Sequence, residues 1–141
     1  ISLSTLYHIY GNVEQLTKSK VWLPSGANLI IETLETLTVI DVNSAKNIVK
    51  KTDVITTINF EAAKEIARQL RLRNISGMII IDFINMKSKE YKHALIEMIK
   101  EETEHATVKT HFSEYTKLGL VEMTRMKNAD AFAKIMKDWK F

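Results

Sequence analysis

The sequence predicts an α/β (α+β) protein in which a mixed β-sheet has helices packed on it. The runs Val39-Ile40-Asp41-Val42 and Ile79-Ile80-Ile81-Asp82 are β-branched apart from one acid each, which is typical of central strands buried on both faces. A hairpin pattern precedes the first run, and a helical pattern follows each of them. The order β-β-β-α-β-α-β-β-α indicates a mixed sheet.

The first three strands are predicted from short apolar runs and turn chemistry. Lys20–Leu23 is expected to form a strand, Pro24–Ala27 supplies turn residues, and Asn28–Glu32 returns as the hairpin partner. The third strand is expected from Leu37 to Asp41. Residues 1–19 have a mixed composition, so we expect a linker or the remnant of a preceding domain.

A basic, polar stretch separates the third strand from the first helix. Residues 44–53 contain Lys46, Lys50 and Lys51 and show no strong period, so we expect a surface loop. Two interpretations fit these residues: an ordinary solvated loop, or a flap that faces phosphate beside Asp41.

Residues 59–73 give the strongest helical pattern in the chain. Asn59 suits the N-cap position, and Glu61 and Glu65 favour the positive end of the helix dipole. The arginines at the other end are explained by the same dipole. Apolar residues at helical spacing predict the buried face, and they are Phe60, Ala63, Ala67 and Leu70.

The second half of the chain continues the alternation of strands and helices. Met78–Phe83 predicts a strand, and Ser88 caps a helix that extends to about Glu104. Residues 107–112 and 118–123 suit strands, and Ala129–Phe141 suits a short amphipathic helix. The inner side of the 88–104 helix is predicted to be Tyr91, Leu95, Met98 and Ile99. Its charged residues indicate a solvated face, and they are Glu90, Lys92, Glu97, Lys100, Glu101 and Glu102.

The composition indicates one globular domain. The chain has 141 residues, 45% of them hydrophobic and 26% charged, which argues against disorder. The net charge of +3 favours an anionic partner only weakly. No Cys is present, which excludes disulfides and thiolate metal sites, so no zinc is expected. The sequence has no membrane span or signal peptide, which indicates a cytoplasmic protein with no membrane partner.

The two acids at the strand ends are the most informative feature. Asp41 and Asp82 both fall where ligands of such sheets bind, beyond the carboxyl ends of the strands. Either acid alone fits a helix cap or a turn. Two carboxylates about 5 Å apart would repel by roughly 3 kcal/mol at an effective dielectric near 20. A shared proton or a bound cation would relieve this repulsion, and oxygen ligands favour a hard ion such as Mg²⁺.

Other chemistries lack their motifs. None of the four Gly forms a GxGxxG or GxxxxGK[ST] phosphate loop, and no GxSxG elbow is present. The four His show neither HExxH nor another paired ligand spacing, and we interpret them as ordinary surface or boundary residues. Metal chemistry at paired Asp residues is the hypothesis that remains.

Four motifs in order identify a family resemblance. Together, these four motifs resemble the catalytic DNase I-like subdomain of the ribonuclease E/G family. Leu23–Gly26 also matches the stretch that leads into this subdomain. The likeness covers about Lys20 to Lys127, which divides the chain into 1–19, 20–127 and 128–141. Because the chain begins at Ile1 without Met, we expect a piece of a longer protein. The four motifs are Asp41–Ser44, Asn59–Arg73, Gly77–Ile84 and Leu118–Arg125.

The resemblance implies a Mg²⁺-dependent endoribonuclease that cleaves single-stranded RNA and leaves a 5′-phosphate, with Mn²⁺ as an alternative ion. By resemblance, Asp41 and Asp82 hold the metal and Asn43 supports them at the catalytic site. Basic residues would hold the phosphate backbone, which makes binding weaken with salt. The candidates are Lys46, Arg71, Arg73, Lys109, Lys117 and Arg125.

The chain also departs from the family pattern. The S1 and 5′-sensor domains that precede this subdomain in the family are missing, and so are the paired Cys that link protomers through zinc. Asn85 occupies a position that is often acidic. A homo-oligomer is therefore an open expectation, and the isolated piece is expected to be weak or inactive. The alternative is a non-catalytic RNA-binding or scaffold domain, which would bind RNA in a salt-sensitive way without metal-dependent cleavage.

Overall fold

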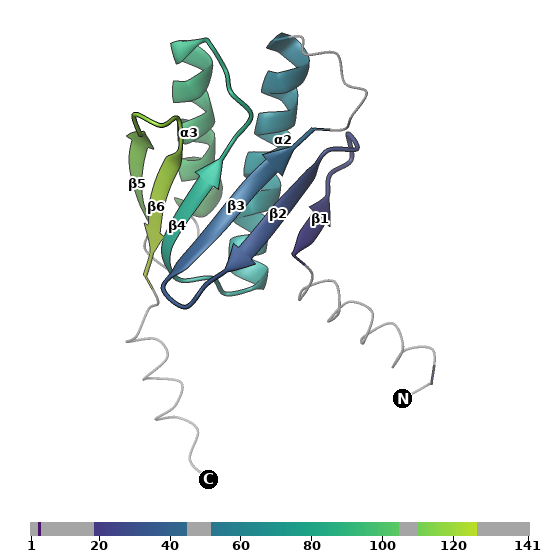
Figure 1. Ribbon diagram of the computed structural model, residues 1–141, viewed down its shortest axis with the longest axis vertical. Helices are drawn as coiled ribbons and strands as arrows, with labels where there is room; N and C mark the ends of the chain where they lie inside the picture. Colours follow the sequence, from purple (N-terminus) through teal and green to yellow (C-terminus); the bar gives the residue numbers. More distant parts are fainter. Residues whose placement is uncertain (1–2, 4–18, 45–51, 105–109, 127–141) are drawn as a thin grey trace.

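The computed structural model describes residues 3, 19–44, 52–104 and 110–126. Within these ranges the chain forms one six-stranded sheet with two helices behind it (Figure 1). The strand order is β1-β2-β3-β4-β6-β5. The elements are β1 (Lys20–Trp22), β2 (Asn28–Thr33), β3 (Leu37–Asn43), α2 (Thr52–Leu72), β4 (Gly77–Asp82), α3 (Lys89–Glu104), β5 (Thr110–Tyr115) and β6 (Val121–Arg125).

The predicted α+β class with a mixed sheet is confirmed. β3 and β4 are parallel, and the other neighbouring strands are antiparallel. The parallel pair is joined through α2, as a crossover connection requires. The predicted helix at 129–141, nearly all of the proposed 1–19 linker and most of the 44–53 loop lie outside the described residues.

The core lies between the sheet and the helices. Along β3, Thr38, Ile40 and Val42 are buried, while the residues between them are half-buried on the opposite face. Figure 1 shows both α2 and α3 on one side of the sheet, so none of the described elements covers the other side. We call this second side the open face. The core includes Leu29, Ile31, Ile40, Ile66, Leu70, Ile79, Ile81, Leu95, Ile99 and Met123.

The first helix begins earlier than predicted. α2 starts at Thr52, so Asn59 lies inside the helix and the expected N-cap at Asn59 is wrong. The added segment 52–58 is rich in β-branched residues, which have reduced helix propensity because their side chains crowd the preceding turn. Burial of Thr56 and Ile58 in the core overrides that local preference. The predicted buried residues Ala63, Ala67 and Leu70 are confirmed.

The later elements keep their predicted type but shift in position. α3 starts directly after Ser88, whose Oγ accepts a hydrogen bond of 3.3 Å from the Tyr91 N–H, so the predicted cap is confirmed. Leu95 and Ile99 are buried as predicted, whereas the Tyr91 side chain is exposed. β5 and β6 each begin three residues later than the predicted strands at 107–112 and 118–123.

Arg125 joins the end of the sheet to the end of α2. It is only 5% exposed, and its Nη1 donates hydrogen bonds to the carbonyl oxygens of Leu70 (2.9 Å) and Ile75 (2.7 Å). The Leu70 carbonyl lies in the last turn of α2, where backbone acceptors lack partners within the helix. The Leu70 carbonyl oxygen also accepts a hydrogen bond from the Ile75 N–H at 3.0 Å, so Arg125 adds a second, charged donor there and supplies a donor to the buried Ile75 carbonyl oxygen.

We expect Arg125→Met to destabilise the fold by about 2–4 kcal/mol, because it removes two charge-assisted hydrogen bonds from the buried carbonyl oxygens of Leu70 and Ile75. Urea unfolding of the two proteins measures the difference. Arg68→Met is the matched control, since Arg68 is exposed and pairs only with Glu65 one turn away, and it should change stability by less than about 0.5 kcal/mol. Equal loss in both variants would show that the buried hydrogen bonds of Arg125 are unimportant.

Candidate functional site

The parallel pairing of β3 and β4 brings the two predicted acids together. Asp41 and Asp82 are direct partners in the register of the two strands, and neighbouring strands lie about 4.8 Å apart. Asp41 alternates with the buried Ile40 and Val42, and Asp82 follows the buried Ile81. Both carboxylates therefore project from the open face, near the carboxyl ends of the strands.

The electrostatics agree with this placement. Burial, followed by the negative charge of Asp82, raises the pKa of the Asp41 carboxyl above its ordinary value, and hydrogen bonds from Val42 and Asn43 partly oppose the shift. In the part of the chain that the structure describes, no Lys or Arg forms an ion pair with either acid. The pair thus concentrates negative charge that a cation would neutralise.

Asn43 lies two residues beyond Asp41 on the same face of β3. Its side chain hydrogen-bonds the Asp41 carboxylate, and this contact lowers the pKa of Asp41. A neutral amide in this position holds the carboxylate in one orientation without cancelling its charge. The structure therefore places Asn43 beside the acid that it was predicted to support.

Asn59 holds the segment that follows Asp82, a contact that the sequence did not suggest. This side chain is completely buried. Its Nδ2 donates to the Ile84 carbonyl oxygen at 2.8 Å, and its Oδ1 accepts from the Ile84 N–H at 3.1 Å. Because Ile84 lies two residues after Asp82, the helix α2 fixes the course of the chain immediately beyond this acid.

The four predicted RNA-binding residues that the structure describes do not form one surface. Lys46 and Lys109 lie outside the described residues. Arg71 and Arg73 lie at the end of α2, and α2 returns the chain to the start of β4, so they are at the opposite end of the sheet from Asp82. Arg71 also donates to the Glu102 carbonyl oxygen at 3.0 Å.

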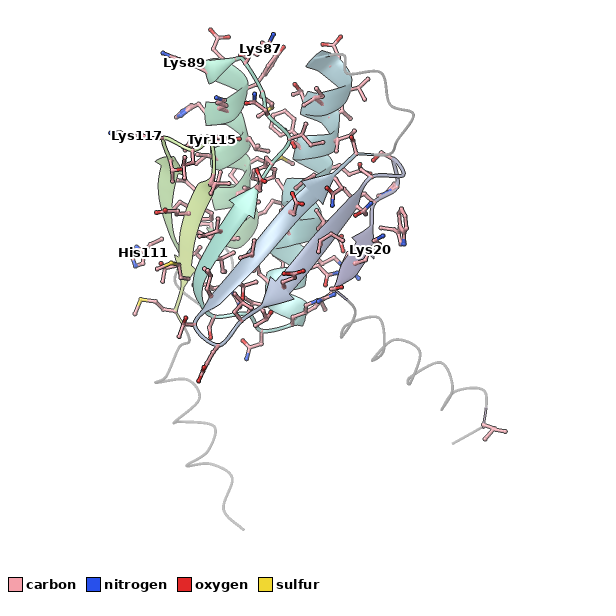
Figure 2. All side chains as sticks on the ribbon, in the orientation of Figure 1. Lys20, Lys87, Lys89, His111, Tyr115 and Lys117 are labelled. Carbon is pink, nitrogen blue, oxygen red and sulfur yellow. The ribbon has the colours of Figure 1, made fainter. Side chains whose placement is uncertain are left out.

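The remaining two candidates differ sharply in exposure. Lys117 is exposed in the turn between β5 and β6, and it lies at the same end of the sheet as Asp82 (Figure 2). Arg125 is buried and bonded to backbone carbonyls, so its guanidinium has no surface to offer RNA. We correct that assignment: Arg125 stabilises the fold, because hydrogen bonds within the protein already use it.

A basic and aromatic pair on the open face was missed. Lys20 and Trp22 occupy alternate positions of β1, and the Lys20 Nζ lies 5.2 Å from the centroid of the Trp22 ring. The register places Lys20, Ile30, Asp41 and Asp82 in one row across four strands. Trp22 is 66% exposed, which suits stacking of a nucleic-acid base. The Lys-x-Trp spacing in a predicted strand was the available signal.

The donor set fits Mg²⁺ held in part by waters and substrate. Among the described residues, no three His, Cys, Asp or Glu side chains gather as a complete metal cage. Mg²⁺ commonly binds through only one or two carboxylates and completes its shell with water and phosphate oxygens. Two adjacent Asp residues with no cationic partner in the described ranges match that pattern.

The fold and the paired acids define the class: an α+β domain with a carboxylate pair on the open face of its sheet. Sequence comparison then identifies the family, because the profile of the ribonuclease E/G family matches residues 1–128. The chain belongs to this family.

The similar proteins include ribonuclease E of Synechocystis sp., which is 41% identical over 129 residues, covering 90% of this chain and 19% of that protein. Ribonuclease G of Salmonella typhimurium is 35% identical over 133 residues, covering 93% of this chain and 27% of that protein. Ribonuclease E of Nostoc sp. is 39% identical over 134 residues, covering 94% of this chain and 20% of that protein. The chain therefore spans between a fifth and about a quarter of the length of these relatives.

No helix among the described residues is long and apolar enough to cross a membrane.

Proposed function

We propose that this chain is the metal-binding catalytic part of an endoribonuclease that hydrolyses phosphodiester bonds of single-stranded RNA and leaves a 5′-phosphate. The single observation that supports it most is the in-register pairing of Asp41 with Asp82 on the open face of the sheet. Membership of the ribonuclease E/G family supports RNA as the substrate.

Asp41 and Asp82 would hold Mg²⁺, or Mn²⁺ in its place, at the edge where β3 and β4 end. When bound, such an ion stabilises the charge that develops on a phosphodiester and lowers the pKa of its bound water. Asn43 keeps the Asp41 carboxylate oriented, and the Asn59 contacts to Ile84 keep Asp82 in place. On the same face, Trp22 offers a ring for a base, and Lys20 offers a charge for the neighbouring phosphate.

The deciding experiment measures cleavage of a single-stranded RNA by the intact protein, with and without Asp41→Asn or Asp82→Asn. Salt-sensitive RNA binding without any metal-dependent cleavage, even at high protein concentration, would instead identify a non-catalytic RNA-binding domain. The intact protein is required because the relatives are about four to five times longer than this chain.

Metal binding has a separate test that does not depend on activity. Without divalent ions, Asp41→Asn should stabilise the fold at neutral pH by about 1 kcal/mol, because it removes a repulsion that solvent partly screens. Since the pKa of Asp41 is raised in the folded state, the metal-free protein should lose stability as pH rises from the ordinary value of 3.8 through the folded pKa. In Asp41→Asn this loss should be absent.

Added Mg²⁺ should reverse the order of stability. Melting temperature measured by calorimetry should rise with Mg²⁺ concentration in the unmodified protein and stay level in Asp41→Asn, because only a state with both carboxylates binds the ion well. Glu32→Gln is the matched control: Glu32 is an exposed acid on the same face, paired with Val39 rather than with the acidic pair. An equal Mg²⁺ response in all three proteins would argue against the site.

A further inference from the structure

A hollow of about 240 Å³ lies between α3 and the edge strand β5, on the helix-covered side of the sheet and away from the acidic pair. We call it the α3–β5 hollow. Its size is below the roughly 300 Å³ at which pockets for drug-sized ligands begin, so it suits a small group. It is lined by Lys89, Lys92, His93, Ile96, Glu97, Lys100 and Tyr115.

The lining is basic. Three Lys face one Glu, and Glu97 already pairs with Lys100 at 3.5 Å. Lys89 and Lys92 are therefore positive charges without a carboxylate partner among the described residues. Their spacing of three residues places them on one side of α3. Two ammonium groups on one side of α3 that no described carboxylate neutralises favour an anion between them.

Tyr115 adds an unused hydrogen-bond donor. Its hydroxyl is buried and has no hydrogen-bond partner in the described part of the structure. Burial raises the pKa of Tyr115 to about 12, so the phenol stays protonated at neutral pH. The Lys92 Nζ lies over the Tyr115 ring, 5.3 Å from its centroid, so the ammonium and the phenol line the same hollow. A buried donor without a partner is costly unless a ligand or water accepts its hydrogen bond.

The hollow is close to the end of the sheet that carries Asp82. Tyr115, Val121 and Ile81 form one row across β5, β6 and β4, so the backbone at Tyr115 is about 10 Å from the residue that precedes Asp82. Asp82 itself projects from the opposite face. Figure 2 shows Lys89, Tyr115 and Lys117 at the same end of the molecule. Lys117 is exposed in the β5–β6 turn at this end.

We propose that the α3–β5 hollow binds a phosphate group of the RNA strand whose scissile bond lies at Asp41 and Asp82. The strand would pass from the open face around the β5–β6 turn, beside Lys117, and place one phosphate between Lys89 and Lys92. The Tyr115 hydroxyl would donate a hydrogen bond to the same phosphate. This inference rests on the proposed function, because it takes RNA as the ligand.

The test uses the intact protein and a single-stranded RNA that cannot be cleaved because its sugars carry 2′-O-methyl groups. The double variant Lys89→Gln/Lys92→Gln should weaken binding about 10-fold or more at low salt. It should also make the slope of log affinity against log salt shallower by about 0.7 for each lost phosphate contact. Tyr115→Phe, which removes only the hydroxyl, should weaken binding about 3- to 10-fold without changing the slope. Lys64→Gln on the exposed side of α2 is the control and should change neither.

The outcomes separate this inference from the proposed function. Unchanged RNA affinity and salt slope in both hollow variants would overturn the inference, even where Asp41→Asn still abolishes cleavage. Weakened RNA binding in the hollow variants would support it, even where Asp41→Asn retains cleavage and the proposed function fails. Inorganic phosphate is the second probe, and its binding is measured as protection of the backbone amides around the hollow from hydrogen exchange. If phosphate gives this protection while the RNA affinity is the same in the variants and the unmodified protein, a free phosphate compound is the ligand and the RNA assignment is wrong. A change in oligomeric state in the double variant would also overturn it, because the hollow would then be an interface between copies.

Discussion

Replacing either Asp41 or Asp82 by Asn is expected to lower RNA cleavage by the intact protein about 10³-fold or more, while the protein stays folded. Each carboxylate supplies one of two adjacent negative charges on the open face, and the amide that replaces it is a far weaker ligand for a hard cation. Loss of the charge stabilisation that such an ion provides accounts for an effect of this size. Initial rates on a labelled single-stranded RNA, measured over a range of Mg²⁺ concentrations, give the ratio.

Two further variants sharpen this experiment. Asn43→Ala should reduce the rate by about 10- to 100-fold, as is typical when a group that orients a metal-binding carboxylate is lost. Higher Mg²⁺ should recover part of that rate, since Asn43 supports Asp41 without carrying charge. Glu32→Gln should cleave at the unmodified rate. If both Asp variants kept full activity, the carboxylate pair would have no part in catalysis, and the scaffold alternative would replace the proposed function.

Asn59→Leu is expected to cost about 2–4 kcal/mol of stability and also to slow cleavage. The substitution keeps a similar volume but removes both hydrogen bonds to Ile84, which leaves a backbone N–H and a backbone carbonyl without their partners. For a chain of this size, such a loss lowers the melting temperature by roughly 8–15 °C. Urea unfolding and calorimetry measure this part of the prediction.

The effect of Asn59 on the site is separable from its effect on stability. Assays well below the melting temperature of the variant compare folded proteins only, and there the half-saturating Mg²⁺ concentration should rise, because Asp82 lies two residues before the released segment. Thr57→Ala is the control on the same helix: Thr57 is exposed and its hydroxyl donates only to the Asp53 carbonyl oxygen. A variant of Asn59 that lost stability but kept an unchanged Mg²⁺ dependence would show a purely structural role.

Several elements could be predicted because their signals are local. Turn residues between short apolar runs identified the β1–β2 hairpin, and continuous β-branched residues identified β3 and β4. The start of α2 could not be found in this way. Its first seven residues are poor helix formers. They become helical because Thr56 and Ile58 in this segment are buried. The predicted starts of β5 and β6 were each three residues too early, because neither strand has a strong sequence pattern of its own.

The side chains with structural roles were the hardest to interpret. Arg125 and Asn59 are polar, so sequence reasoning assigned the first to RNA and the second to a helix cap. Both are buried, and both bond to backbone groups between 25 and 55 residues away. A polar residue gives no local indication that distant carbonyl or amide groups will come within reach. Likewise, Lys92 and Lys100 were interpreted as part of a solvated helix face, because β5 had not yet been placed beside α3.

The sequence by itself determined that two strands end on acids, that no thiolate chemistry is available and that the chain resembles one ribonuclease family, because these properties depend on residue types and short spacings. Only the tertiary structure decided that Asp41 and Asp82 are neighbours on the same face. That outcome depends on a parallel register between strands 41 residues apart, which the crossover through α2 sets. A shift of one residue in this register would turn one carboxylate into the core, since side chains alternate between the two faces of a strand.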